Sequence, residues 1–317
     1  MRILVTGGAG FIGSNLCDSL LGQGHEVIAL DSLLTGRLKN LDSCAAHPNF
    51  EFIQRRTEDV IDVRPDAVFH LASPASPVGY GQHPIETLSA NSEGTRRVLD
   101  LCRSTGAKFL LASTSEVYGD PLEHPQKETY FGNVDPIGPR SCYDEGKRFS
   151  EAMAVWYRLE YGVNTRIVRI FNCYGPRNAL DDGRMVPTFI EQALRDLPMT
   201  VYGDGQQTRS LCYVTDMVAG LQAAMFSADT TGEVYNLGNP QEHTVVEFAQ
   251  IIKELSSSRS EIVHVEGRDG EIARRKPDIT KASRHLGWEP KVDLRDGLRT
   301  TVAWGREELG LVAPATA

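Results

Sequence analysis

The sequence lacks several features that would place it in a well-known class of proteins. No apolar run approaches the roughly 18 residues of a membrane-spanning helix, so we expect no membrane partner. The histidines show neither H-x-x-x-H nor H-E-x-x-H spacing, and no G-x-S-x-G segment occurs, which disfavours zinc hydrolases and serine hydrolases. Basic side chains are outnumbered 33 to 42, and the net charge of −9 is unlike that of a nucleic-acid binder. We expect neither a bound metal nor a nucleic-acid partner.

Cysteine is also scarce, and no C-x-x-C pair occurs. The six cysteines lie far apart, at positions 17, 44, 102, 142, 173 and 212. Widely spaced cysteines of this kind are typical of reduced, buried thiols in a cytosolic protein. Strand-like residues begin at Arg2, so we expect no signal or transit peptide before them. These features predict a cytoplasmic location.

The first half of the chain alternates short apolar runs with longer helical patterns. The strand-like runs are apolar almost throughout, as strands covered on both faces must be. They lie at residues 2–6, 26–30, 50–55, 67–71, 108–114 and 165–170, and helices are predicted at 11–21, 85–104 and 141–161. Because parallel strands need crossover connections, this order predicts an α/β fold with a doubly wound, Rossmann-type parallel sheet.

Three glycines mark the turn between the first strand and the first helix. Gly7 makes the tight turn, Gly10 lets the backbone approach a pyrophosphate, and Gly13 allows the helix to pack closely on the strand. The N–H groups at the helix start, including those of Phe11 and Ile12, are available to phosphate oxygens. A glycine pattern between a strand and a helix predicts dinucleotide binding.

An acidic residue, Asp31, ends the second strand. A carboxylate at this position accepts hydrogen bonds from both adenosine ribose hydroxyls and repels a 2′-phosphate, which favours NAD over NADP. Arg37 is the nearest basic residue downstream and leaves NADP open. The ends of the third and fourth strands are also expected at the cofactor, through Asp59, Val60, Leu71 and Ala72.

After Asn172 the sequence changes character, with more loops and fewer long helices. Helices are predicted at residues 187–196, 216–226 and 245–255, and strands at 234–237 and 262–265. We expect residues 1–172 to form the NAD-binding domain, with 206–238 returning to it. Residues 173–317 are expected to form mainly a smaller C-terminal lobe that binds the substrate.

Tyr143 and Lys147 lie four residues apart and therefore on one face of a helix. A phenol with a pKa of about 10 is a poor base, but a nearby ammonium group favours the phenolate and lowers that pKa. Ser113 and Thr114 end a strand upstream, where the Thr114 hydroxyl can hydrogen-bond a substrate alcohol. The three groups predict alcohol oxidation by hydride transfer to NAD. They disfavour an NAD-binding sensor or scaffold, which needs only the cofactor site.

These motifs resemble those of the extended short-chain dehydrogenases that act on nucleotide sugars. Longer strings are similar to those of the UDP-glucuronate decarboxylases (UDP-xylose synthases). They include HLASPASP at 70–77, STSEVYGDP at 113–121, CYDEGKR at 142–148, TVYGDGQQTRS at 200–210 and RKPDITKA at 275–282. The resemblance implies that UDP- or dTDP-glucuronate becomes the nucleotide xylose, through C4 oxidation, loss of CO₂ and re-reduction by the bound cofactor.

The resemblance also assigns roles around the reacting sugar. It makes Tyr143 and Lys147 the catalytic pair and Thr114 the assisting hydroxyl. Ser115 and Glu116 match the positions that mark decarboxylases, where related 4,6-dehydratases carry Asp-Glu and 4-epimerases carry small or hydroxylated residues. A dehydratase needs an acid to protonate the departing C6 hydroxyl, and Ser115 is a poor substitute for it. A dehydratase or an epimerase remains the alternative within the same machinery.

Other matched positions lie on the substrate side. The resemblance associates Arg275 with the sugar carboxylate, and it places Asn172, Arg184 and Arg209 at the nucleotide diphosphate. Tyr202 falls where relatives contact the base. The C-terminal lobe is thus expected to bind a nucleotide sugar.

A homodimer is implied as well, with helices 85–104 and 141–161 forming a four-helix interface. Trp156, together with Val155 and Leu159, is predicted to lie in the helix core rather than to form a platform for the sugar.

Overall fold

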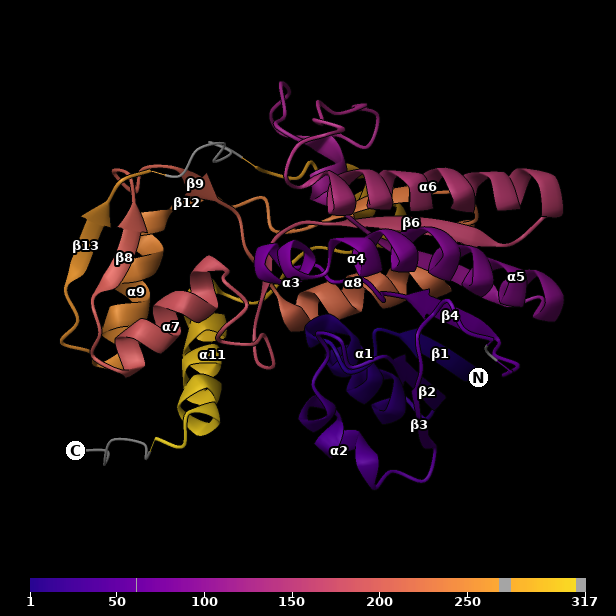
Figure 1. The fold of residues 1–317 in the computed structure, drawn as a ribbon, viewed down its shortest axis with the longest axis horizontal. Coiled ribbons are helices and arrows are strands. Elements are labelled where there is room, and N and C mark those ends of the chain that lie inside the picture. The colour runs from indigo at the N-terminus through magenta and orange to yellow at the C-terminus, as the bar shows by residue number, and fades with distance from the viewer. Residues whose placement is uncertain (61, 268–274, 312–317) are drawn as a thin grey trace.

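The computed structural model describes residues 1–60, 62–267 and 275–311. Its main sheet is parallel (Figure 1). In the described residues this sheet has seven strands in the order β3-β2-β1-β4-β5-β6-β11. They are β1 (Arg2–Thr6), β2 (Glu26–Asp31), β3 (Phe50–Gln54), β4 (Ala67–His70), β5 (Lys108–Thr114), β6 (Thr165–Ile170) and β11 (Val234–Leu237). The strand order reverses between β1 and β4, where folds of this type have their crevice. The predicted Rossmann-type sheet is confirmed.

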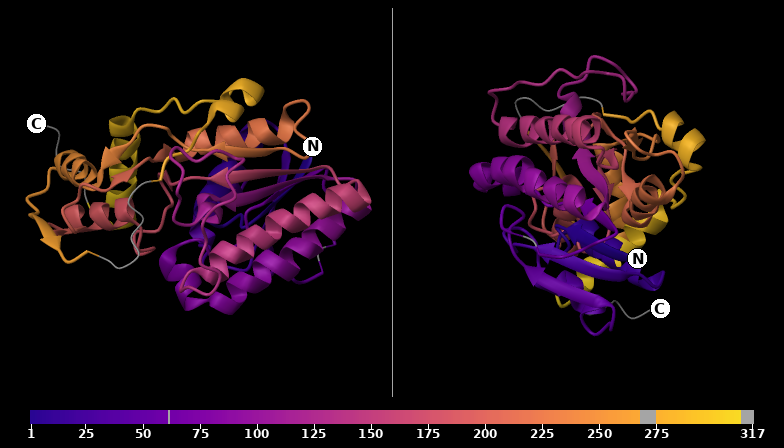
Figure 2. Two further views of the ribbon diagram at one scale, coloured as in Figure 1. Left: turned by 90° about the horizontal axis from the view of Figure 1, so that it is seen from above. Right: turned by 90° about the vertical axis from the view of Figure 1, so that its right-hand side faces the viewer.

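Helices cover both faces of the sheet (Figures 1 and 2). On one face lie α1 (Phe11–Gly22) and α8 (Val214–Phe226), and on the other α5 (Thr95–Thr105) and α6 (Ser141–Tyr161). Successive strand residues point to opposite faces, so Ile3 joins the core of the first face and Leu4 that of the second. Burial on both sides explains why these strands are apolar almost throughout.

The helix predicted at 85–104 is interrupted by a π-helical turn. The observed elements are α4 (Pro84–Ser89), the π-turn η2 (Ala90–Gly94) and then α5. Ser150 Oγ donates to the carbonyl oxygen of Asn91 (2.6 Å), and Thr95 Oγ1 donates to that of Ala90 (3.4 Å). Side-chain hydroxyls thus bond to main-chain carbonyl groups of the turn, and such insertions are a known cause of local helix widening.

A second lobe lies beside the carboxyl ends of the strands (Figure 1, left). The strands β8 (Met199–Tyr202) and β13 (Ile262–Val265) pair in parallel, and α7 (Met185–Leu194), α9 (Val245–Ser256) and α11 (Leu294–Glu308) pack together beside them. Helix α7 begins two residues before the predicted start because Pro187 fits in the first turn of a helix. Helix α11 was not predicted, although Leu294, Leu298 and Val302 repeat at helical spacing after the N-cap Asp293.

In the described chain no helix is both long and apolar enough to cross a membrane. Short elements complete the described chain. They are η1 (Leu38–Leu41), α2 (Asp42–Ala45), α3 (Pro77–Gln82), η3 (Ser115–Tyr118), β7 (Cys173–Tyr174), β9 (Thr208–Arg209), β10 (Cys212–Tyr213), β12 (His243–Thr244) and α10 (Thr280–Leu286). Of the segment 206–238, α8 and β11 join the main sheet, whereas β9 pairs with β12.

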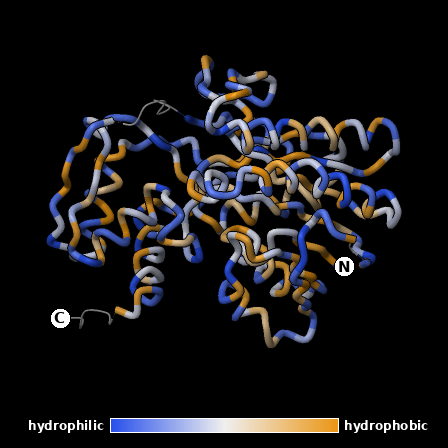
Figure 3. The backbone as a smooth tube through the Cα atoms, in the orientation of Figure 1, coloured by the Kyte–Doolittle hydropathy of each residue, from blue (hydrophilic) through white to orange (hydrophobic). Residues whose placement is uncertain are grey.

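The prediction that Trp156 lies in the core is wrong. The buried face of α6 includes Tyr143, Lys147, Ser150 and Ala154, and Trp156 lies away from it, with 65% of its surface exposed. Figure 3 shows hydrophobic and hydrophilic positions alternating along the helices that cover the sheet. Helical periodicity identifies the faces of a helix but does not say which apolar face meets the sheet.

Candidate functional site

A cavity of about 790 Å³ lies at the carboxyl ends of the strands, bordered by both lobes. Its walls come from the glycine turn, the ends of β2, β4 and β5, the start of α6, the segment that follows β6, and two arginines from later in the chain. Most of the predicted site residues line it: Gly7, Gly10, Phe11, Ile12, Gly13, Asp31, Leu71, Ala72, Ser113, Thr114, Ser115, Glu116, Tyr143, Lys147, Asn172, Arg184, Arg209 and Arg275.

In the glycine turn the main chain lies very close to the end of β4 and to the start of α1. Gly7 has a φ of 71°, and a Cβ atom there would lie 2.9 Å from the nitrogen of Ala72. A Cβ atom on Gly13 would overlap the carbonyl oxygen of Gly7. Because α1 begins at Phe11, its first N–H groups have no partner within the helix. The start of α1 therefore presents free donors to the cavity, and the glycines of the turn leave no side chain in the way.

Asp31, the last residue of β2, is held in place by the main chain. Its carboxylate accepts hydrogen bonds from the nitrogen atoms of Ala9 (3.0 Å) and Leu33 (2.8 Å). Burial raises the pKa of Asp31, and these backbone hydrogen bonds oppose the rise. A fixed acceptor near the free N–H donors at the start of α1 fits the ribose and pyrophosphate of a dinucleotide.

Arg37, the basic residue that left NADP open, lines the cavity and is already ion-paired. Its guanidinium forms ion pairs with Asp181 and with Glu308 of α11 (3.4 Å to Glu308), and Lys39 pairs with the same Glu308. A 2′-phosphate would have to compete with two carboxylates for this guanidinium. The geometry around Asp31 therefore suits NAD better than NADP.

Two residues predicted at the cofactor do not reach the cavity. Val60 is 71% exposed, and Asp59 accepts a hydrogen bond from the nitrogen of Arg56 (3.2 Å) within the turn after β3. Thr57 and Glu58 line the cavity in their place. Strand periodicity located the end of β3, but the shape of the turn decides which residue faces inward.

Tyr143 lies in the chemical part of the cavity, at the start of α6. Its ring stacks on that of Tyr80, with centroids 5.2 Å apart and 12° between the planes. Burial raises the pKa of Tyr143, and the hydrogen bond with Thr114 and the charge of Arg184 oppose the rise. The predicted lowering of this pKa is not found in the structure, because burial outweighs the favourable contacts.

Lys147 lies one helical turn after Tyr143 on α6 and is also buried. Its Nζ donates to the carbonyl oxygen of Ala112 (2.9 Å), and burial lowers its pKa to about 8 against the opposing charge of Glu151. Glu151 also accepts a hydrogen bond from the hydroxyl of Ser113 (2.6 Å) and forms a bidentate ion pair with Arg169 (2.7 and 2.9 Å). The lysine is thus held by the end of β5 and by its own helix.

A neutral hydrogen-bond network lies behind the strand ends. His70, the last residue of β4, is hydrogen-bonded to Thr6 Oγ1 of β1 (2.8 Å) and to Thr95 Oγ1 of α5 (3.1 Å). The Thr95 hydroxyl is in turn hydrogen-bonded to Ser150 Oγ of α6 (3.2 Å). Burial lowers the pKa of His70 to about 3, so the ring is uncharged at neutral pH. This network ties β1, β4, α5 and α6 together with no net charge.

A cluster of charges lies beside Thr114 and Tyr143. Glu116 of η3 pairs with Arg275 through one carboxylate oxygen and with Arg140 through the other. Asp144 lies next to them, and burial raises its pKa to about 6 against the charges of Arg140 and Arg275. Arg275 also donates to the carbonyl oxygen of Gly119 (3.2 Å). Two guanidinium groups are therefore held in place by carboxylates at the edge of the cavity.

On the substrate side, Arg184 is held by Asp182 (3.1 Å) and by the carbonyl oxygen of Ala75 (2.6 Å). Arg209 donates to the carbonyl oxygen of Thr208 (2.8 Å) and also faces the cavity. Tyr202 is not among the residues that line the cavity; it ends β8, where it pairs with Val265 of β13. The structure thus brings the predicted diphosphate residues together but not the predicted base contact.

Sequence reasoning missed Arg140 and Tyr80, which both line the cavity. Arg140 is the N-cap residue of α6, three positions before Tyr143, so helical spacing could have pointed to it. Tyr80 lies in α3, whose start is marked by the N-cap Ser76 and by Pro77. That signal predicts a short helix, but it does not predict that Tyr80 stacks on Tyr143.

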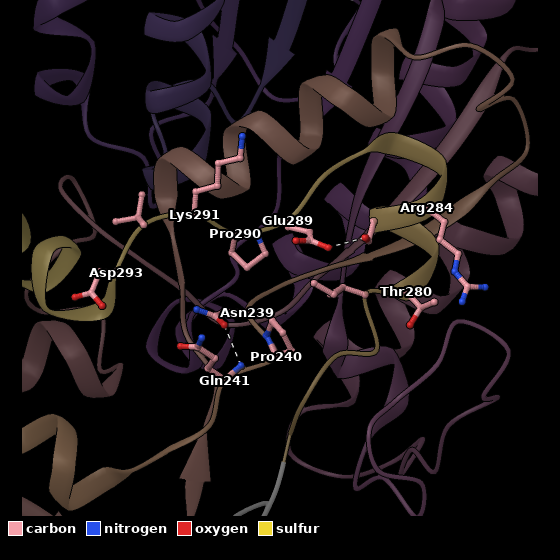
Figure 4. A pocket seen from close by; sticks show the side chains of 12 residues that line it. Asn239, Pro240, Gln241, Thr280, Arg284, Glu289, Pro290, Lys291 and Asp293 are labelled. Atoms are coloured by element: carbon pink, nitrogen blue, oxygen red, sulfur yellow. Dashed lines mark hydrogen bonds between the residues drawn. The ribbon is translucent and has the colours of Figure 1, made fainter.

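A second hollow lies away from this cavity, between β11, α10 and the segment before α11 (Figure 4). Ser283 donates to Glu289 (2.7 Å), and the nitrogen of Gln241 donates to Asn239 Oδ1 (2.9 Å), so these polar groups bond to one another. In the described part of the chain no group of three His, Cys, Asp or Glu residues could hold a metal ion.

The parallel sheet, the glycine turn and the Thr-Tyr-Lys group place the protein in the class of short-chain dehydrogenases and reductases. A family model described as GDP-mannose 4,6 dehydratase matches residues 4–301. UDP-glucuronic acid decarboxylase 1 from Arabidopsis thaliana is 53% identical over 303 residues, which are 96% of this chain and 69% of that protein. The chain belongs to the family of the UDP-glucuronic acid decarboxylases, as the sequence motifs predicted.

Solved structures share the fold over nearly all of the chain. UDP-glucose 4-epimerase from Thermotoga maritima, solved with UDP-glucose, has a TM-score of 0.89 and 34% identity, covering 98% of this chain and all of that one. UDP-glucuronic acid 4-epimerase from Bacillus cereus, solved with UDP-glucuronic acid and NAD, has a TM-score of 0.85 and 29% identity, covering 97% of this chain and 100% of that one.

Proposed function

We propose that this protein is an NAD-dependent decarboxylase that converts a nucleotide glucuronate to the nucleotide xylose. The observation that carries the proposal is the pairing of Arg275 and Arg140 with Glu116 at the edge of the cavity that also contains Thr114 and Tyr143. One cavity thereby combines the groups for alcohol oxidation with cationic groups for a carboxylate. The UDP-glucuronic acid decarboxylases of the same family support this combination.

NAD fits the first part of the cavity. The glycine turn and the start of α1 would hold the pyrophosphate, Asp31 the adenosine ribose, and Tyr143 and Lys147 the reactive end. Leu71, Ala72 and Ser113 complete this wall. When bound, NAD supplies the acceptor for the hydride of C4 and later returns it. The Bacillus cereus epimerase of similar fold was solved with NAD and UDP-glucuronic acid together.

The protein's own groups act on the C4 hydroxyl. Tyr143 takes the proton as its phenolate, a form that the ammonium of Lys147 and the positive charge of bound NAD would favour against the effect of burial. Thr114 hydrogen-bonds the same oxygen, so that C4 becomes a ketone. This ketone is β to the C5 carboxylate, and the carbonyl accepts the electron pair when CO₂ leaves. Tyr143 and Thr114 then stabilise the enolate oxygen. Protonation at C5 and reduction at C4 complete the conversion without net oxidation.

The charged side of the cavity would bind the carboxylate before it is lost. Arg275 and Arg140 supply the positive charge, while Glu116 fixes both guanidinium groups. Ser115 lies beside them and lacks the acidity that elimination of a C6 hydroxyl would need. Asn172, Arg184 and Arg209 are the candidates for holding the nucleotide diphosphate.

We also propose that the protein is a homodimer through the continuous segment α4–η2–α5 and through α6, which pack side by side. Ile85 of α4 is 68% exposed, and Phe149 and Trp156 of α6 are 52% and 65% exposed. Apolar surface of this kind on two neighbouring helices is typical of an interface.

Light scattering tests this interface. It should give twice the chain mass for the wild type and a lower mass for Trp156→Glu, and an unchanged mass for the variant would contradict the proposed interface.

A cytoplasmic location is proposed from the cysteines. All six are free thiols in the structure, and four of them are buried. Burial raises the pKa of Cys102 and of Cys44 to about 12, so these thiols stay protonated. Free structural thiols are typical of reducing compartments. Fractionation of the source cells should find the protein in the cytosol.

Product analysis tests the proposed reaction. The purified protein is incubated with UDP-glucuronate, dTDP-glucuronate and the two corresponding nucleotide glucoses, and the products are identified by mass spectrometry and NMR. We expect CO₂ and the nucleotide xylose from a glucuronate, no net NADH, and in D₂O one deuterium at C5. A nucleotide galacturonate with no CO₂ would show a 4-epimerase, and a 4-keto-6-deoxy product from a nucleotide glucose would show a dehydratase.

A further inference from the structure

Arg275 reaches the cavity from a chain segment that belongs to neither the sheet nor a helix. Its guanidinium meets Glu116 and the carbonyl oxygen of Gly119, and its own carbonyl oxygen accepts a hydrogen bond from Ser210 Oγ (3.2 Å). Its position therefore depends on how the next residues, 276–278, are held against the rest of the molecule.

Gln126, in the segment after η3, holds these residues. Its nitrogen donates to the carbonyl oxygen of Lys276 (2.9 Å), and its own carbonyl oxygen accepts from the nitrogen of Asp278 (2.8 Å). Its side chain adds two bonds: Oε1 accepts from the nitrogen of Lys276 (2.9 Å), and Nε2 donates to the carbonyl oxygen of Glu123 (2.6 Å). The residue is completely buried, so water cannot replace these contacts.

The other side of residues 276–278 is supported as well. Asn236 of β11 donates its side-chain amide to the carbonyl oxygens of Gln126 (3.0 Å) and Asp278 (3.3 Å). Pro277 lies so close to Gly238 that a Cβ atom there would be 2.9 Å from the proline ring. The segment is thus fixed both along its length and toward the sheet.

We propose that Gln126 is a positioning residue that sets the place of Arg275 against Glu116, and thereby the affinity for the sugar carboxylate. The inference rests on the proposed function, in which Arg275 binds that carboxylate. Gln126 is not among the residues that line the cavity, so its effect passes through residues 276–278 to Arg275. A glutamine suits the position because its amide offers one donor and one acceptor to the two main-chain partners.

Binding in the Tyr143→Phe holoenzyme tests the proposal, because turnover in this background is expected to be slow enough for substrate binding to be measured. We compare dissociation constants for UDP-glucuronate and UDP with and without Gln126→Met, which keeps the size of the side chain but removes its hydrogen bonds. We expect UDP-glucuronate to bind at least tenfold more weakly and UDP and NAD to change by less than twofold. Equal losses for UDP-glucuronate and UDP would overturn the proposal.

Gln222→Met is the matched control. Gln222 of α8 is also buried and bonded at both ends of its amide, to Ser19 (2.8 Å) and Gln23 (2.5 Å), but it lies against α1 rather than near Arg275. We expect a similar loss of stability with no change in the ratio of the two dissociation constants. If Gln126→Met does not fold, Gln126→Asn serves instead, because its amide is one methylene too short to reach both partners. The same selective loss is expected from it.

A double substitution separates positioning from a general structural role. In the Arg275→Ala background, Gln126→Met should weaken UDP-glucuronate binding by no more than a further twofold, because the group it positions is gone. Losses that multiply would overturn the inference. If Arg275→Ala itself leaves UDP-glucuronate binding unchanged, the proposed carboxylate site fails; if it weakens binding and Gln126→Met does not, Gln126 alone loses its role.

Discussion

The two ends of the cavity are built in different ways. The cofactor end comes from neighbouring strand ends, and behind it lies the uncharged chain from Thr6 through His70 to Thr95. The carboxylate end is built from charges on separate segments, with Glu116 between Arg140 and Arg275. Neutral hydrogen bonds of a rigid sheet give a surface of fixed shape, whereas the charge cluster matches one chemical group of one substrate. Cofactor binding and substrate choice should therefore be separable by substitution.

The largest expected effect is at Tyr143, where the two ends meet. Tyr143→Phe keeps the ring and its stacking on Tyr80 but removes the group that takes the C4 proton. We expect kcat to fall by about 10³-fold, in the range typical of a general base, with NAD and UDP binding retained. Steady-state kinetics and NAD titration measure both. Tyr157→Phe, the same change elsewhere on α6, is the control, and near-normal kcat in Tyr143→Phe would contradict the mechanism.

The next effect concerns the carboxylate end alone. Arg275→Ala leaves Glu116, whose side chain is 15% exposed, with one of its two cations missing and removes a charge that binds the sugar carboxylate. We expect kcat/KM for the glucuronate to fall about 100-fold, because breaking such charge pairs costs several kcal/mol. The inhibition constant of UDP should stay within twofold. Arg284→Ala, at the second hollow of Figure 4, is the control. An equal loss in UDP affinity would show that the two ends are not separable.

A weaker effect is expected at the cofactor end. Asp31→Ala removes an acceptor for ribose hydroxyls and a charge that repels a 2′-phosphate, so NAD should bind about 10-fold more weakly and NADP relatively better. Fluorescence titration with NADH and NADPH measures the ratio. Asp59→Ala, in the turn after β3, should leave both affinities unchanged because Asp59 bonds to the main chain of its own turn and does not line the cavity. Tighter wild-type binding of NADP than of NAD would sink the assignment.

The smallest effect concerns the stability of the neutral network. Below about pH 6.5 the unfolded chain binds a proton at His70, whereas the folded protein, with its pKa near 3, does not. The free energy of unfolding therefore falls as the pH drops through this window, by up to about 1.4 kcal/mol per pH unit. Urea unfolding between pH 5 and pH 7.5 should show a loss about 2 kcal/mol smaller for His70→Gln than for the wild type. Parallel pH curves for the two proteins would contradict a neutral His70.

Local patterns predicted most of the fold because each element carries its own signal. The strand from Arg2 to Thr6 and the helix that follows Gly10 were readable from apolar runs and glycine spacing. The predictions were weaker where a neighbour decides: Trp156 is exposed because another face of α6 meets the sheet, and α4 and α5 are joined through a π-turn that Ser150 stabilises from another helix. Tyr202 and Asp59 miss the cavity because pairing and turn shape orient them.

The sequence by itself determined the parallel sheet, the dinucleotide turn and the helical pair Tyr143–Lys147, because their residues are close in the chain and their geometry follows from strand and helix periods. Only the tertiary structure decided which charges meet. Glu116, Arg140 and Arg275 come from three segments, and Gln126 contacts Arg275's neighbours across the molecule. The direction of each pKa shift was decided there too, since burial depends on what the whole chain packs around a group.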